Sequence, residues 1–158
     1  MPGRITHEDV MIVEAFPPID TTGNIQTGNA VHVGNSSHVI VKISTGLWAG
    51  GNAAVTLQQG TAQAMGDAKT LAFSFMYTND GAPTASLLTK TAVSGDTFNV
   101  DTALSMYVIE IPIDTLDVDG GFDYLRVVTA SPGANADLIQ ADYYLSGNRF
   151  HGDTTPLT

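Results

Sequence analysis

The chain has 158 residues, a length that fits one domain, and it contains no cysteine, which excludes disulfides and cysteine-ligated zinc. Sixteen acidic residues oppose six basic ones, so the formal net charge is −10. The few lysines and arginines are scattered, and we therefore expect no binding to nucleic acid or to an anionic membrane surface.

The first residues carry no targeting pattern. Polar Thr6, His7, Glu8 and Asp9 follow the initial methionine, where a secretory signal would place an apolar core. No apolar run has the length of a membrane-spanning helix. We expect a chain that is made in a cytosol.

Alternation of apolar and polar residues is the dominant pattern along the chain. Such a period of two predicts half-buried strands. It is strict over residues 39–43, 71–77 and 107–113, and shorter runs elsewhere show the same pattern. About eight strands are predicted, at Val10–Phe16, Val39–Ile43, Ala54–Gln59, Leu71–Tyr77, Ser86–Val93, Tyr107–Ile113, Phe122–Thr129 and Ile139–Ser146.

Clusters of turn-forming residues separate these strands. Gly50-Gly51-Asn52, Asn79-Asp80-Gly81 and Asp119-Gly120-Gly121 are examples. The spacing predicts an all-β fold, an antiparallel sandwich or jelly roll. We predict an N-terminal arm over residues 1–30, a sandwich over 31–147 and a tail over 148–158, with 17–35 and 147–158 as arms that reach a partner.

Catalytic and cofactor motifs are not found. The four histidines lie far apart, and no Gly-x-Ser-x-Gly elbow, phosphate-binding loop or dinucleotide fingerprint occurs. A carboxylate pair of the glycosidase kind would need residues such as Glu110, which alternation places on the solvent side. We therefore expect no enzyme activity and no cofactor.

One acidic stretch is a candidate calcium site. Asp117, Asp119 and Asp123 follow one another at i, i+2 and i+6, and hard cations prefer such oxygen ligands. An EF-hand would require glycine and glutamate where Phe122 and Val128 stand. A tight turn between two strands is the alternative interpretation of the same residues.

Six aromatic residues could form a sugar-binding platform, as in β-sandwich carbohydrate modules. Core packing is the alternative, because most of them lie within alternating strands. They are Trp48, Tyr77, Tyr107, Tyr124, Tyr143 and Tyr144.

The layout of strands and turns resembles small virion proteins of tailed phages and prophages. The likeness covers about residues 38–148 and is carried by the stretches 55–59, 71–73, 107–111, 116–127, 132–139 and 144–147. It is a pattern of strands and turns and includes no active-site motif.

This resemblance implies a capsid decoration (cement) protein on the outside of the head. Its partners would be the major capsid protein and other copies of itself, for which a trimer is a common form in such proteins. It would be made in the bacterial host cytoplasm and end in the virion. A head–tail connector, a tail or fibre-base protein and a carbohydrate-binding module remain alternatives.

Overall fold

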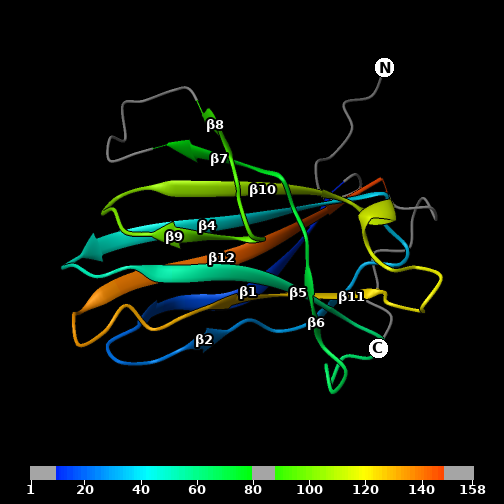
Figure 1. Ribbon diagram of the computed structural model, residues 1–158, viewed down its shortest axis with the longest axis horizontal. Coiled ribbons are helices and arrows are strands. Elements are labelled where there is room, and N and C mark those ends of the chain that lie inside the picture. The colour runs from blue at the N-terminus through cyan, green and yellow to red at the C-terminus, as the bar shows by residue number, and fades with distance from the viewer. Residues whose placement is uncertain (1–9, 80–87, 148–158) are drawn as a thin grey trace.

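Two antiparallel sheets contain all the strands of residues 10–79 and 88–147, which are the residues that the computed structural model describes (Figure 1). The predicted all-β sandwich is confirmed. Sheet A has the order β1 (Val10–Asp20), β12 (Asp137–Ser146), β4 (His38–Trp48), β10 (Met106–Pro112), β7 (Phe75–Asn79) and β8 (Thr89–Ala92).

Sheet B is built around two central strands, β11 and β5, which pair with each other. Each central strand is flanked by two short strands, so both edges of this sheet are interrupted. The members are β2 (Gln26–Thr27) and β3 (Val31–His32) beside β11 (Tyr124–Thr129), and β6 (Lys69–Leu71) and β9 (Thr97–Val100) beside β5 (Ala53–Gly60).

The strand pairs are nested in the sequence. β1 pairs with β12, β2 and β3 pair with β11, β4 pairs with β10, and β5 pairs with β9. From one pair to the next, the first strand lies later in the sequence and its partner lies earlier. The two halves of the chain therefore run side by side, and both contribute to both sheets.

Alternation along the strands creates the core between the sheets. Val41 lies opposite Ile109 on one side and Tyr143 on the other, and all three side chains are fully buried. From sheet B, Leu57 and Leu125 face them and are equally buried. The period of two thus predicted the buried face of the central strands correctly.

Tyr143 connects the two sheets by hydrogen bonds as well as by packing. Its hydroxyl accepts a hydrogen bond from the Val127 amide at 2.8 Å and donates one to the Asn29 carbonyl at 3.1 Å. A buried phenol must satisfy its polar end in this way. Burial also raises the pKa of Tyr143 above its ordinary value, so the hydroxyl keeps its proton.

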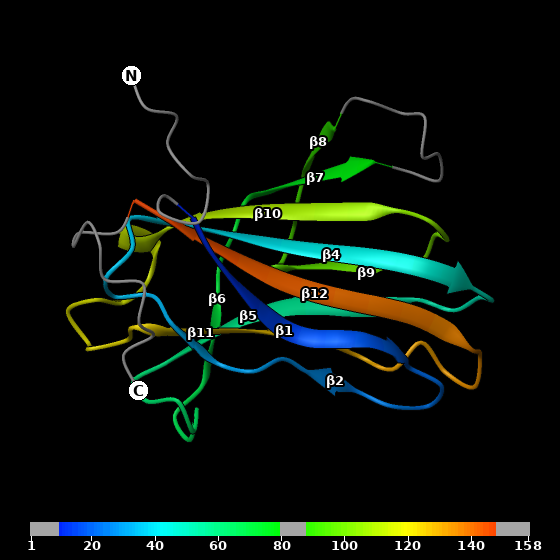
Figure 2. The ribbon, with the colours of Figure 1, turned by 180° about the vertical axis from the view of Figure 1, so that it is seen from behind.

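The predicted strand Leu71–Tyr77 is wrong as a single element. β6 ends at Leu71 in sheet B, and β7 begins at Phe75 in sheet A, so the chain crosses between sheets (Figure 2). Leu71 and Phe73 are buried, whereas Phe75 lies on the exposed side. The crossing changes the phase of the alternation, which period-two patterning alone could not reveal.

The predicted N-terminal arm is corrected for residues 10–30, because β1 and β2 belong to the sandwich. β1 pairs with β12 as far as Asp20, and Pro17 and Pro18 lie within β1 at a register shift between Phe16 and Ile19. Proline is compatible with this strand because β1 is the edge of sheet A, where a missing N–H breaks no ladder. Residues 17–35 are therefore no free arm, and residues 1–9 and 148–158 of the predicted arms lie outside the described residues.

The remaining predicted strands agree with the structure apart from their ends. The run Ser86–Val93 corresponds to β8, although Ser86 and Leu87 fall outside the described residues. A short 3₁₀ helix, η1 (Ile113–Thr115), follows β10. The connections lie at two opposite ends, with η1 at one end and the β4–β5 and β9–β10 turns at the other (Figures 1 and 2).

Replacing Tyr143 by phenylalanine tests the connection between the sheets. Tyr143→Phe leaves the buried Val127 amide without the hydroxyl acceptor, and we expect a loss of about 1–3 kcal/mol of unfolding free energy. Urea denaturation measures it. Tyr144→Phe, on the opposite face of the same strand, is the control and should be close to neutral; equal stability of the two variants would contradict this role.

Candidate functional site

The loop between β10 and β11 forms the surface at one end of the sandwich. Pro112 ends β10, and the Thr115 hydroxyl donates a hydrogen bond to the Pro112 carbonyl across η1. Ile113 and Leu116 are buried and anchor the loop to the core. This anchoring leaves the acidic residues that follow at the surface.

Asp117 organises the turn that the sequence predicted at this position. Its Oδ1 accepts a hydrogen bond from the Gly120 amide at 3.0 Å, and its own amide donates to Gln59 Oε1 at 2.8 Å. Gly121 has a φ of 77°, a conformation that glycine adopts without steric cost. The Asp-Gly-Gly sequence therefore acts as a turn here, as the alternative interpretation expected.

Lys69 from β6 forms an ion pair with Asp117. The Lys69 ammonium donates to Asp117 Oδ2 and also lies 3.8 Å from the centre of the Phe122 ring, in a cation–π contact. The hydrogen bond from Lys69, followed by that from Gly120, holds the pKa of Asp117 below its ordinary value. Both carboxylate oxygens of Asp117 therefore accept hydrogen bonds that hold the loop in place.

Asp123 is paired with a histidine from β3. Its Oδ2 lies 3.0 Å from His32 Nε2, and the His32 ring packs edge-on against Tyr124 at 5.1 Å between centres. The Asp123 backbone bonds to Val33 and Gly60, which fixes its position between β3 and β5. Its Oδ1 is buried and accepts no hydrogen bond from the part of the chain that the structure describes.

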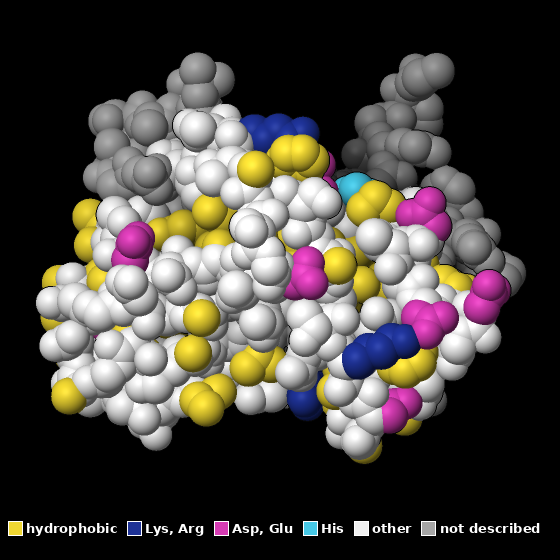
Figure 3. Space-filling model, in the orientation of Figure 1, with side chains coloured by type: hydrophobic (Ala, Val, Ile, Leu, Met, Phe, Trp, Pro, Cys, Tyr) yellow, Lys and Arg dark blue, Asp and Glu magenta, His cyan; other side chains and the backbone are white. Residues whose placement is uncertain are grey.

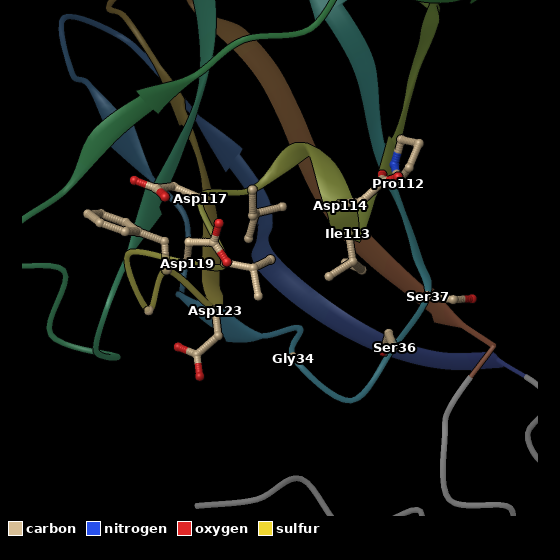
Figure 4. A pocket seen from close by; sticks show the side chains of 13 residues that line it. Gly34, Ser36, Ser37, Pro112, Ile113, Asp114, Asp117, Asp119 and Asp123 are labelled. Carbon is tan, nitrogen blue, oxygen red and sulfur yellow. The ribbon is translucent and has the colours of Figure 1, made fainter.

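A depression of about 840 Å³ lies among these groups. Its lining combines serine hydroxyls from the β3–β4 connection with carboxylates and apolar side chains from the β10–β11 loop (Figure 4). The lining residues are Gly34, Ser36, Ser37, Pro112, Ile113, Asp114, Leu116, Asp117, Val118, Asp119, Gly121, Phe122 and Asp123. Four of the lining side chains are carboxylates.

The predicted calcium grouping is not formed. Asp117, Asp119 and Asp123 all line the depression, but their carboxylates point in different directions (Figure 4). No group of three potential metal ligands occurs among residues 10–79 and 88–147. The turn at Gly120 and Gly121 separates the three carboxylates, and Lys69 and His32 each occupy one of them.

The predicted aromatic platform is divided between core and surface. Trp48, Tyr107 and Tyr143 are buried, and the Trp48 indole donates to the Gly51 carbonyl at 3.0 Å. Tyr124 packs on His32 within sheet B, and Tyr77 lies in sheet A. These six aromatic residues therefore offer no shared flat surface to a sugar ring.

Sequence patterns gave no indication of Lys69 and His32. Lys69 is 48 residues from Asp117, and His32 is 91 residues from Asp123. Neither belongs to a local motif, and only the pairing of β5 with β6 and of β3 with β11 brings them to this end. Of the other histidines, His38 begins β4, and His7 and His151 lie outside the described residues.

Comparisons with protein-family models, curated proteins and solved structures found no match to this chain. Among the described residues, no helix has the length and apolar character needed to cross a membrane.

The Lys69–Asp117 ion pair predicts a pH-dependent stability difference. Asp117→Asn keeps an oxygen for Gly120 but loses the ion pair, and we expect a fall in Tm of about 1–3 °C at pH 7. Because the folded-state pKa lies below 3.8, the stabilisation is present above that pH and is lost as the pH falls through the folded-state value.

Thermal scans at pH 7 and at about pH 2.5 measure this difference. Asp119→Asn, in the same loop, serves as the matched control and should shift Tm at neither pH. If the Tm of D117N is as far below the wild-type Tm at about pH 2.5 as at pH 7, the charge of the Asp117 carboxylate is not the cause of the difference.

Calcium gives a second prediction at this end. Because Asp117, Asp119 and Asp123 do not converge, we expect neither millimolar calcium nor EDTA to shift the Tm. Titration calorimetry with calcium should give only heat of dilution. Saturable heat that Asp119→Asn abolishes would restore the calcium hypothesis.

Proposed function

We propose that this chain is a decoration (cement) protein of a tailed-phage head, which binds the outside of the assembled shell and bridges neighbouring major capsid subunits. The observation that carries the proposal is the nested strand order. Sheet A contains the order β1, β12, β4 and β10, and in sheet B β2 and β3 lie beside β11 while β6 and β9 lie beside β5; this nested order supports a jelly roll as the finer class of sandwich. Jelly rolls recur in viral capsid proteins and in lectins.

The surface chemistry is consistent with adhesion. Around the depression, Lys69 and His32 engage the carboxylates of Asp117 and Asp123, so these groups maintain the loop structure. Fold alone does not determine function. The likeness of residues 38–148 to small virion proteins gives the second, independent support, and the net charge of −10 suits a position away from packaged DNA.

The mechanism is linked binding. A protein that binds only the assembled lattice stabilises that lattice by about 2.7 kcal/mol per site at a concentration of 100 times Kd. An oligomer of this chain, such as a trimer, would contact several capsid subunits and gain from effective concentration. Residues 148–158, outside the described part, remain the candidate arm for such contacts.

Two alternatives differ in what they require. A connector, tail or fibre-base protein would be present in a few symmetric copies per particle. A carbohydrate-binding module fits the lectin occurrence of jelly rolls, but the burial of Trp48, Tyr107 and Tyr143 removes half of its predicted platform.

Binding to head particles tests the proposal. Purified chain is added to heads that were assembled without it, and the two are co-sedimented through a sucrose gradient. We expect saturable binding at hundreds of copies per head and a higher temperature of head disruption. Saturation at about six or twelve copies would indicate a connector position, and no binding would exclude a virion role on the shell.

A further inference from the structure

The end of the sandwich opposite η1 exposes three leucines. Leu47 is 63% exposed, Leu104 is 64% exposed and Leu138 is 42% exposed. They come from the end of β4, from the turn between β9 and β10, and from the beginning of β12. Leu47 and Leu104 stabilise the fold little, because most of their surface stays in water.

The three leucines lie around one residue, Gly46. The Leu104 amide donates to the Gly46 carbonyl at 3.0 Å, and Leu47 follows Gly46 in the chain. A Cβ on Gly46 would lie 3.2 Å from Leu138 Cβ, so Leu138 covers the glycine closely. Leu138 also occupies a register shift between Asp137 and Ile139, an irregularity of the kind that redirects side chains. We call Leu47, Leu104 and Leu138 the leucine cluster.

Leu104 has an unfavourable backbone conformation for its side chain. Its φ is 54°, in the left-handed region, which is unfavourable for leucine and which asparagine and glycine tolerate better. Since the side chain is also largely exposed, the folded state gains little in return. Strain combined with exposure is typical of residues that contact a partner.

The charges around the leucine cluster indicate the chemistry of that partner. Asp20 is the register partner of Leu138, and Asp101 precedes Leu104 by three residues; both are exposed. The described connections at this end, residues 21–25, 49–52, 101–105 and 130–136, contain no lysine or arginine. The complementary surface is therefore apolar with a basic rim.

The opposite end has a different character. Acidic side chains are concentrated at the end that carries η1, and hydrophobic side chains are exposed at the other end (Figure 3). A second copy docked symmetrically on the leucine cluster would bring Asp20 and Asp101 of both copies together, with a net charge of −10 on each chain. The charges thus favour a different, basic partner over a second copy.

We propose that the leucine cluster is the surface that docks on the capsid shell, against an apolar patch of the major capsid protein rimmed by lysine or arginine. The acidic end then faces the solvent. This inference rests on the proposed function and adds to it the orientation of the chain and the side chains in contact.

Leu104→Asn separates binding from folding. Asparagine accepts the left-handed backbone, so the variant should keep or raise the wild-type Tm, while its affinity for heads that lack this chain should fall by about tenfold or more. Leu47→Ser, at a position with ordinary backbone, should weaken binding in the same assay. Binding should also weaken as salt is raised, because the partner's rim is basic.

Ile12→Thr is the matched control. Ile12 is 61% exposed on the outer face of sheet A, away from the leucine cluster, and threonine keeps a β-branched side chain there. The proposal is supported if this variant binds heads with wild-type affinity while L104N and L47S bind them more weakly. Equal loss in all three variants overturns it, since exposed apolar area in general would then be responsible.

Other outcomes distinguish this inference from the proposed function. Wild-type affinity of both L104N and L47S overturns the docking surface and leaves the decoration role in place. Failure of the wild-type chain to bind heads overturns both. If L104N instead converts an oligomer to monomers in analytical ultracentrifugation, without changing the affinity of the chain for heads, the leucine cluster is a contact between copies and the capsid docking proposal is wrong.

Discussion

The pairing of β1 with β12 is the constraint on which the rest of the structure depends. It joins the two ends of the described chain from Val10 to Asp20 of β1, with two register shifts, and all other nested pairs lie between them. Contacts between residues so distant in sequence form slowly, and their formation closes both sheets over one core.

Side chains that cross between the sheets convert this topology into one rigid body. Tyr143 projects from sheet A and bonds to the backbone of Val127 in sheet B, so the two layers cannot slide without losing a buried hydrogen bond. The hydrophobic contact alone would tolerate such a shift, because it has no direction. A rigid sandwich loses little entropy on docking, which suits the shell-binding role proposed above.

The two ends differ because the connections of a sandwich alternate between them. The loop after β10 carries its carboxylates to one end, where Lys69 and His32 arrive from distant strands and pair with two of them. The turns after β4 and β9 carry Leu47 and Leu104 to the other end. Each connection is local in sequence, yet its neighbours at the surface are set by the strand order.

The sequence by itself determined the alternation, and with it the class of fold, the buried faces of β4 and β10 and the turn at Gly120 and Gly121, because period and turn chemistry are local properties. Only the tertiary structure decided that Pro17 and Pro18 lie in an edge strand, that residues 72–74 cross between sheets, and that Asp117 and Asp123 bond to Lys69 and His32 instead of sharing a cation. These outcomes depend on which strands become neighbours. That choice is made by the summed burial and hydrogen bonding of the whole core, which no local pattern contains.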